Sequence, residues 1–270
     1  MGQLAAITWN PDPVAFELFG PLAFTWYGLT WSLSILVGYY LASWMFTREN
    51  VEGADPSNVV TTIFLSCLVG ARLGQVIFYD LNYFLEYPSE IIRVWNGGLA
   101  SHGAVIAAIL SVFYLSKKYE IINFLWLVDR MAIIVLAAGS FIRFGNFMNS
   151  ELYGTPTGSD YGVIFTVHDT IARHPVQLYE SVWLMVCFLI FMLLYTKLKA
   201  WNDGFFASLF LSVVFTGRLL LEFMKESPDL ALGLSRTQWL SVPMILIGLG
   251  GLIYLKRAEI RAQDSNISSI

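Results

Sequence analysis

Charged residues are scarce in this sequence. Asp, Glu, Lys and Arg account for 13% of its 270 residues, whereas soluble globular domains contain about 25%. Hydrophobic residues account for 56% and aromatic residues for 16%, and the mean hydropathy is +0.61. This balance excludes an ordinary soluble domain. It indicates an integral membrane protein, in which Trp and Tyr gather at the two interfaces between lipid and water.

Cysteine, histidine and N-terminal basic residues are also few. Cys67 and Cys187 both lie in apolar runs, which favours small hydrophobic side chains over a disulfide or a metal pair. The three histidines lack the spacing of a shared metal site, so neither a metal nor another cofactor is predicted. A net charge of −4 argues against nucleic acid as a partner. The first twenty residues contain no Lys or Arg, and we therefore expect no cleavable signal peptide.

Long apolar runs are abundant instead. A helix that crosses a bilayer needs about 20 mostly apolar residues. Seven stretches qualify, so the sequence predicts an all-α integral membrane protein in which residues 1–270 form a single polytopic domain. The predicted spans are residues 22–46, 59–79, 99–116, 125–142, 176–196, 205–223 and 237–255.

The distribution of basic residues predicts the orientation of these spans, because cytoplasmic loops are enriched in Lys and Arg. If the N-terminus is outside, the inner loops and the C-terminal tail carry eight basic residues, namely Arg48, Lys117, Lys118, Lys197, Lys199, Lys256, Arg257 and Arg261. The outer loops then carry five, namely Arg93, Arg143, Arg173, Lys225 and Arg236. We therefore predict an outer N-terminus and an inner C-terminus, with the long connections 80–98 and 143–175 outside.

Four charged residues lie in or at the end of predicted spans, namely Arg72, Arg143, Arg218 and Glu222. A charge at the bilayer centre costs about 2.5–3.5 kcal/mol on insertion scales, so each must be paired, hydrated or near an interface. One interpretation is a structural ion-pair network, since Arg218 and Glu222 are four residues apart on one helix face. The other is a cationic site for an anionic phosphate, because the arginines outnumber the one nearby carboxylate.

Two further segments carry polar side chains beside apolar runs. FIRFGNFMNSELYG (residues 141–154) places Asn146, Asn149 and Glu151 next to Arg143 at the outer end of the fourth span. WNGGLASHGAVIAAIL (residues 95–110) introduces His102 on a glycine-rich turn. This histidine is either a hydrogen-bonded core residue or a group for proton transfer near neutral pH.

The other candidate segments have ordinary explanations when each is taken alone. In ARHPVQLYES (residues 172–181), a proline at a helix start and a carboxylate in the first turns are common helix chemistry, which accounts for Gln177 and Glu180. Tyr27, in FTWYGLTWSL, suits an interfacial aromatic belt.

Taken in order, these segments resemble one family, the bacterial prolipoprotein diacylglyceryl transferases. The matching segments are WYGL, GARLGQVIFY, RVWNGGLASHGA, GSFIRFGNFMNSELYG, RHPVQLYE, GRLLLEF and QWLSVPM, between residues 26 and 244. The resemblance implies a seven-span enzyme of the inner membrane with its active site toward the outer leaflet. Ala104 stands where many members have a second glycine, and the short connection 155–172 predicts a small periplasmic head.

The resemblance also implies the reaction and its substrates. The diacylglyceryl group of phosphatidylglycerol moves to the thiol of the lipobox cysteine in a prolipoprotein signal peptide. A thioether forms, and glycerol phosphate leaves. Both substrates meet the enzyme in the lipid bilayer.

The candidate residues divide into catalytic and substrate-binding groups. Arg143 and Arg218 are expected to hold the lipid phosphate and stabilise its developing charge. His102 is the first candidate for the base that takes the thiol proton, with Glu151 and Glu222 as alternatives. The remaining substrate-binding candidates are Tyr27, Asn146 and Asn149, which would orient the headgroup or the peptide, and Gly154, which would let the substrate backbone approach closely.

Other classes of membrane protein explain fewer of these residues. A transporter or channel predicts related broken helices in two halves, and none is evident. A retinal-type receptor needs a lysine in the last span, which has none, and a serine protease using Ser101 or Ser140 lacks the Gly-x-Ser-x-Gly context. A lipid-binding or transport protein with an anionic headgroup site stays open as the alternative, although it has no need of His102.

Overall fold

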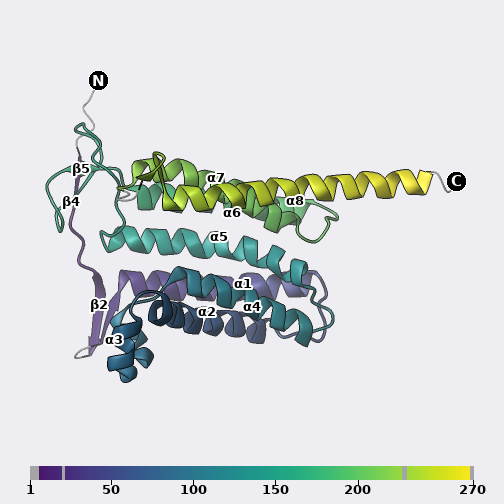
Figure 1. Ribbon diagram of the computed structural model, residues 1–270, viewed down its shortest axis with the longest axis horizontal. Helices are drawn as coiled ribbons and strands as arrows, with labels where there is room; N and C mark the ends of the chain where they lie inside the picture. Colours follow the sequence, from purple (N-terminus) through teal and green to yellow (C-terminus); the bar gives the residue numbers. More distant parts are fainter. Residues whose placement is uncertain (1–5, 20–21, 227–229, 268–270) are drawn as a thin grey trace. The chain divides into compact units, whose positions relative to one another are not determined.

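The computed structural model describes residues 6–19, 22–226 and 230–267, and it is mostly helical (Figure 1). Within these ranges, six helices are long and apolar enough to cross a membrane. They are α1 (Trp26–Arg48), α2 (Pro56–Phe78), α5 (Phe124–Met148), α6 (Val176–Lys197), α7 (Phe205–Leu221) with the turn that follows it, and α8 (Arg236–Ile267). The multi-pass character is confirmed. The predicted span 99–116 coincides with α4 (Ser101–Lys118), which is a helix but not one of these six, so seven spans stay a prediction.

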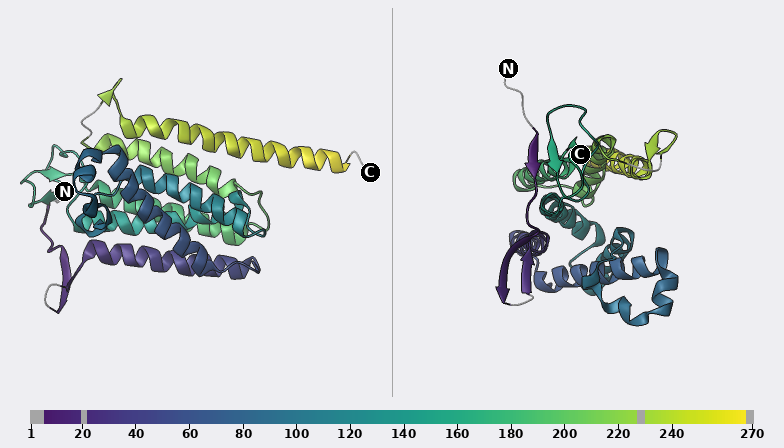
Figure 2. Two further views of the ribbon diagram at one scale, coloured as in Figure 1. Left: turned by 60° about the horizontal axis from the view of Figure 1, so that its bottom comes forward. Right: turned by 90° about the vertical axis from the view of Figure 1, so that its left-hand side faces the viewer.

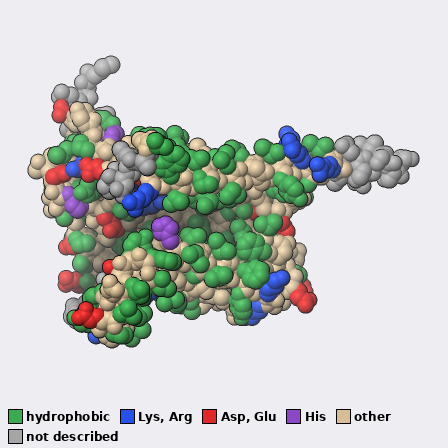
Figure 3. Space-filling view, in the orientation of Figure 1, with side chains coloured by type: hydrophobic (Ala, Val, Ile, Leu, Met, Phe, Trp, Pro, Cys, Tyr) green, Lys and Arg blue, Asp and Glu red, His purple; other side chains and the backbone are tan. Residues whose placement is uncertain are grey.

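The surfaces of these helices are apolar. Along α8 only 17% of the spanning window is buried, and Leu246, Ile247 and Tyr254 are among its exposed side chains. In Figure 3, hydrophobic side chains cover the visible face of α8, and Lys and Arg gather toward its C-terminal end. Exposed apolar surface on this scale is unfavourable in water but suits a lipid environment.

The chain divides into two compact units, each described by itself. The first consists of residues 1–38 and 131–270, and the second of residues 39–130. The boundaries fall within α1 and α5. The single domain of residues 1–270 stays a prediction.

In the second unit, α2 and α4 pack at small residues. A Cβ atom added to Gly74 would lie 2.9 Å from the Cα atom of Gly103, so side chains larger than hydrogen are excluded there. Small residues at this spacing let helix backbones approach closely in membranes. Between the two helices, the connection folds into α3 (Leu81–Glu86) and the short 3-10 turns η1 (Pro88–Ile92) and η2 (Val94–Asn96).

Arg72, on α2, holds this connection in place. Its guanidinium is buried and stacks 4.9 Å from the ring centre of Phe84. It donates to five backbone carbonyls, those of Glu90, Ile91, Arg93, Gly97 and Gly98. Because these carbonyls occupy its donors, Arg72 is not available to an anion. Its inclusion among the cations of a phosphate site was wrong.

In the first unit, α7 and α8 lie side by side (Figure 1). A Cβ atom on Gly248 would lie 2.5 Å from the Ser212 hydroxyl oxygen, so α8 approaches α7 closely at this point. Figure 2 shows the hairpin of β2 (Val14–Phe19) and β3 (Leu22–Thr25) leading into α1. A second, shorter hairpin of β6 (Leu230–Ala231) and β7 (Leu234–Ser235) precedes α8.

The all-α prediction was wrong for the connections, which contain short strands. β4 (Val163–Phe165) pairs in parallel with β1 (Ile7–Trp9) and antiparallel with β5 (Ala172–Arg173). Branched and aromatic residues favour a strand here, and the glycines and proline of the connection disfavour a helix. Phe165 is fully buried against the Phe147 ring, and Trp9 stacks on Phe147 at 4.4 Å. The small sheet is thereby packed onto the end of α5.

Candidate functional site

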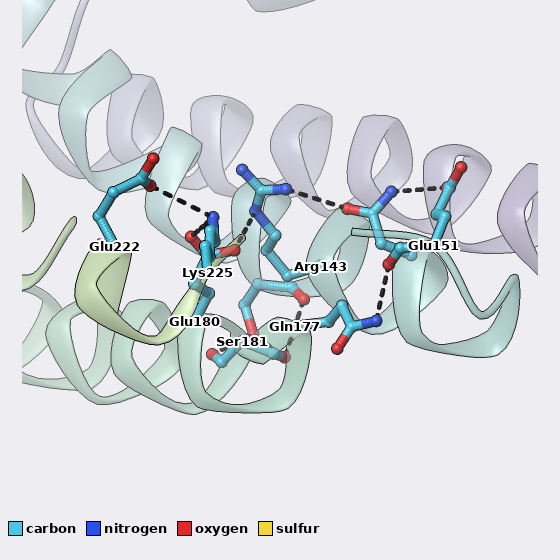
Figure 4. Close-up of polar contacts among 9 residues, drawn as sticks. Arg143, Glu151, Gln177, Glu180, Ser181, Glu222 and Lys225 are labelled. Atoms are coloured by element: carbon cyan, nitrogen blue, oxygen red, sulfur yellow. Dashed lines mark hydrogen bonds and ion pairs between the residues drawn. The ribbon is translucent and has the colours of Figure 1, made fainter. Parts of the chain in front are cut away.

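The C-terminal end of α5 carries a chain of polar contacts (Figure 4). Arg143 and Asn146 are three residues apart and therefore lie on one helix face. Arg143 Nη1 donates to Asn146 Oδ1 at 3.2 Å, and Asn146 Nδ2 donates to Glu151 Oε1 at 2.8 Å. The chain reverses after Met148 through positive φ angles at Ser150 and Leu152, which turns Glu151 back toward the helix. The structure thus brings together three of the residues predicted from this segment.

Glu180, on α6, supplies the counter-charge of Arg143. Its Oε2 atom lies 2.9 Å from Arg143 Nε, and its Oε1 atom accepts a hydrogen bond from Lys225 Nζ at 2.6 Å. Lys225 also lies 3.8 Å from Glu222, whose carboxylate accepts from the Ser235 hydroxyl at 3.1 Å. We call these residues the Arg143 network, namely Arg143, Asn146, Glu151, Glu180, Glu222 and Lys225.

The Arg143 network contains two cations and three carboxylates. The expected surplus of positive charge is therefore wrong for this part of the chain. The network nevertheless leaves a donor open, because Arg143 Nη2 makes no hydrogen bond with the described residues and 23% of the side chain is exposed. A guanidinium fixed at Nε and Nη1, with Nη2 free, can bind an oxyanion.

The helix segment that carries Glu180 is bound to α5 and to the turn that follows α5. Gln177 Nε2 donates to the Glu151 carbonyl oxygen at 2.6 Å. Ser140 and Ser181 each donate to the carbonyl oxygen of the other at 2.9 Å. Sequence reasoning assigned Gln177 and Glu180 to ordinary helix-start chemistry and so missed these contacts. The available signal was the need of Arg143 for a carboxylate on another helix.

Gly154 is surrounded by the protein itself. A Cβ atom at this position would lie 2.5 Å from the Met224 carbonyl oxygen and 2.5 Å from Val176 Cγ2. The Gly154 amide donates to the His174 carbonyl oxygen at 2.9 Å. The space needed for close approach is thus filled by two other segments of the chain. Glycine is required here for internal packing.

Three other predicted residues make no hydrogen bond or ion pair with the network, namely Tyr27, Asn149 and Arg218. Tyr27 packs beside Gly145 of α5, and its hydroxyl has no hydrogen-bond partner in the described ranges. Asn149 Oδ1 is buried and has no partner in the structure as described, so it is an acceptor open to a donor. Arg218, on α7, is exposed and makes no ion pair with Glu222 or with any other described residue.

His102 belongs to the second compact unit, not to the unit that contains the Arg143 network. It is the second residue of α4 and is exposed. The connection held by Arg72 ends at Gly97 and Gly98, immediately before this helix. The structure therefore fixes the backbone that precedes His102.

An apolar groove of about 510 Å³ begins beside the network, within the first unit. Its walls are formed by α1, α5 and α6, and its lining includes Trp26, Leu33, Phe144 and Met185. Phe144 and Ser181, both in the lining, directly follow Arg143 and Glu180 in the sequence. This volume lies within the range of about 300–1,000 Å³ that is typical of ligand pockets.

The connection beyond Gly154 is held by a second, separate set of charges. Arg173 Nη2 lies 2.6 Å from Asp169 Oδ2, and Arg173 Nη1 lies 2.7 Å from Glu226 Oε1. The hydrogen bonds from Arg173, with one from the Ile171 amide, lower the pKa of the Asp169 carboxyl. The same ion pairs raise the pKa of Arg173, which stays charged at every accessible pH.

Acid is expected to weaken this connection. A carboxyl group whose pKa is lowered by folding stabilises the folded state above its usual pKa of 3.8, and the contribution is lost as the pH falls through the folded value. We expect Asp169→Asn to flatten the loss of thermal stability in detergent as the pH falls below about 4. Asp160→Asn, at an exposed carboxylate without an ion pair in the described ranges, is the control. An unchanged acid profile in Asp169→Asn would contradict this assignment.

Comparison with known proteins shows the family of this chain. The sequence model of the prolipoprotein diacylglyceryl transferase family matches residues 13–254. The chain belongs to this family. A phosphatidylglycerol–prolipoprotein diacylglyceryl transferase of Tolumonas auensis is 40% identical over 245 residues, which are 89% of this chain and 94% of the relative. The protein of the same name from Chloroherpeton thalassium is 39% identical over 254 residues, covering 92% and 94%.

A more distant relative covers almost the whole chain. The enzyme of the same name from Chlamydia caviae is 34% identical over 98% of this chain and 98% of its own length. The resemblance drawn from the sequence motifs is therefore confirmed. The family matched is that of a transferase, and the six long apolar helices agree with a multi-pass membrane enzyme.

Proposed function

We propose that the chain is a phosphatidylglycerol–prolipoprotein diacylglyceryl transferase that holds the lipid phosphate on Arg143. The family match over residues 13–254 carries the activity. The open Nη2 donor of Arg143, fixed by Glu180 and Asn146, supports the assignment of the phosphate. In the reaction, the thiolate sulfur forms a bond to the glyceryl carbon, and the bond from that carbon to the phosphate oxygen breaks. Glycerol phosphate leaves with the electron pair.

Negative charge develops on the phosphate oxygen as glycerol phosphate leaves, and cations near this oxygen would stabilise it. Arg143 supplies one, and the exposed Arg218 supplies a second cation that has no partner in the described ranges. Preorganised cations of this kind stabilise a leaving oxyanion. Tyr27, Asn146 and Asn149 would orient the headgroup or the peptide, and the open Asn149 Oδ1 suits a hydroxyl donor. The apolar groove beside Arg143 would hold an acyl chain of the same lipid.

The thiol proton must go to a base, because the thiolate is the nucleophile. His102 is the candidate we favour. The alternatives are Glu151, which accepts a hydrogen bond from Asn146, and Glu222, which accepts one from Ser235, and these contacts leave them less available. His102 is exposed at the start of α4. After it takes the proton, its positive charge would also stabilise the thiolate.

The proposed topology has seven spans, with α4 as the third, the N-terminus outside and the C-terminus inside. The network uses the C-terminal end of α5 and the N-terminal end of α6, and Lys225 follows α7. In this topology all three positions face outward. The site would therefore lie toward the outer leaflet of the inner membrane, with the small sheet of β1, β4 and β5 as a periplasmic head.

The activity is tested directly with purified protein. Phosphatidylglycerol labelled in its diacylglyceryl group is mixed with a synthetic lipobox peptide, and label on the peptide is measured. A peptide with serine in place of the lipobox cysteine is the control. We expect labelled peptide only with cysteine. Specific binding of phosphatidylglycerol without any transfer would contradict the proposal and favour the lipid-binding alternative.

Replacing His102 tests the base. We expect His102→Asn and His102→Gln to lower the transfer rate by about 100-fold or more, because a positioned base contributes about 10²- to 10⁴-fold. Rates are measured in detergent across the pH range. Near-normal turnover at every pH would rule out a general-base role and leave the phosphate itself as the proton acceptor.

A further inference from the structure

Glu180 is shared between two cations, and only one of them has been assigned a role. One carboxylate oxygen lies against Arg143 Nε, and the other accepts from Lys225 Nζ. In Figure 4 the dashed lines from Lys225 and from Arg143 end on the two different oxygens of the Glu180 carboxylate. The exposed fractions of the Lys225 and Glu180 side chains are 18% and 10%, so water competes little for these contacts.

The second contact determines how Glu180 can bind Arg143. A free carboxylate prefers to bind a guanidinium through both of its oxygens, in a fork of two parallel hydrogen bonds. The fork available here would use Arg143 Nε and Nη2, which point the same way from the planar group. In the structure the second oxygen accepts from Lys225 instead, and Nη2 remains without a hydrogen bond in the part of the chain described.

Lys225 is itself held in place by the backbone around Gly154. The Thr155 amide donates to the Met224 carbonyl oxygen at 2.8 Å, and Gly154 and Lys225 form an isolated β-bridge. On the other side, Glu226 pairs with Arg173. The lysine therefore has a defined position relative to Glu180, which is not typical of an exposed loop side chain.

We propose that Lys225 is a positioning residue, which keeps Glu180 from closing a two-point fork on Arg143 and so leaves Nη2 free for the lipid phosphate. This inference rests on the proposed function. Lys225 does not need to touch the substrate. It acts through the carboxylate of Glu180, 45 positions away in the sequence.

The first test compares substitutions of Lys225. Lys225→Met should lower kcat/KM for phosphatidylglycerol by about 10- to 100-fold, as expected when a charge-assisted hydrogen bond to the substrate is lost. Lys225→Arg, which keeps a donor for Glu180, should restore most of the rate. Lys256→Met, at an exposed lysine of α8, is the matched control for loss of charge. Wild-type rates in Lys225→Met, or no rescue by arginine, would overturn the inference.

The second test asks whether Lys225 acts through Glu180. Glutamine has only one acceptor oxygen and cannot form the fork, so Lys225→Met should change kcat/KM little in a Glu180→Gln background. An equal loss in both backgrounds would overturn the inference and indicate an independent role. Transfer by the wild-type protein is measured alongside. If the wild-type protein shows no transfer, the proposed function is wrong. If the wild-type protein is active but the variants do not behave as predicted, only the inference about Lys225 is wrong.

A third measurement does not depend on Glu180→Gln. Binding of phosphatidylglycerol and of neutral diacylglycerol to the detergent-solubilised protein is compared for wild type and Lys225→Met. The inference predicts weaker binding only of the lipid that carries a phosphate. Equal weakening for both lipids would indicate general damage to the structure and would overturn it.

Discussion

Replacing Arg143 with lysine is expected to reduce diacylglyceryl transfer by about 100- to 1,000-fold, the usual effect of removing one donor to a developing oxyanion. Lysine keeps the positive charge and can still pair with Glu180. It has no planar fork, however, so it cannot contact Glu180 and Asn146 and also present a fixed donor to phosphate. The measurement is the initial rate of label transfer to a lipobox peptide at saturating phosphatidylglycerol.

The control for this prediction is an arginine outside the site. Arg93 forms an exposed ion pair with Glu90, and such surface pairs contribute about 0–1 kcal/mol. Arg93→Lys should therefore transfer at close to the wild-type rate. Expression and thermal unfolding of Arg143→Lys should resemble those of wild type, because its charge remains paired. A rate within a few-fold of wild type would show that the shape of the guanidinium is not needed.

Replacing Gly154 with alanine is expected to lower transfer by about 100-fold, although alanine is the smallest side chain that can be added. The new Cβ atom would lie 2.5 Å from the Met224 carbonyl oxygen and 2.7 Å from that of His174. Both distances are much shorter than a normal van der Waals contact between carbon and oxygen, so the segment that carries Lys225 must move. A displacement of about 1 Å can cost about 10²-fold in rate even when it begins away from the reacting atoms.

Gly250 provides the matched control for this substitution. It lies in α8, and a Cβ atom there would meet nothing within 4 Å. Gly250→Ala should keep full activity and gain slightly in stability, because alanine favours a helix. Kinetics and thermal midpoints are measured for both variants. Full activity in Gly154→Ala would mean that the Met224 segment can shift without disturbing Glu180 and Arg143.

Part of the site was accessible from the sequence because its members are local. Arg143, Asn146 and Glu151 lie within nine residues, and their position at the end of an apolar run identified them as unusual. The family resemblance added roles for Tyr27 and Arg218, which stay predictions. It also added close approach of the substrate at Gly154, where the structure places two other segments of the chain. Glu180 was set aside because a carboxylate near a helix start has an ordinary explanation. Its partner Arg143 is on another helix, and no local pattern links the two.

The same limitation affected the arginines. Arg72 and Arg143 look alike in sequence, since each is a single cation among apolar residues. The structure shows that backbone carbonyls occupy Arg72, whereas Arg143 keeps one donor open. Whether an arginine keeps a free donor depends here on where the connection 88–98 folds, which is a property of the tertiary structure.

The multi-pass membrane character of this chain, the positions of its long helices and its family all follow from the amino-acid sequence. Length and hydropathy of a segment are local properties, and a membrane helix satisfies its backbone hydrogen bonds within the segment. The contacts of Glu180 with Arg143 and Lys225, and the packing of Gly154 against Met224, became known from the three-dimensional structure. These contacts join segments that are distant in the chain, and burial and geometry select them among many pairs of the same chemical type.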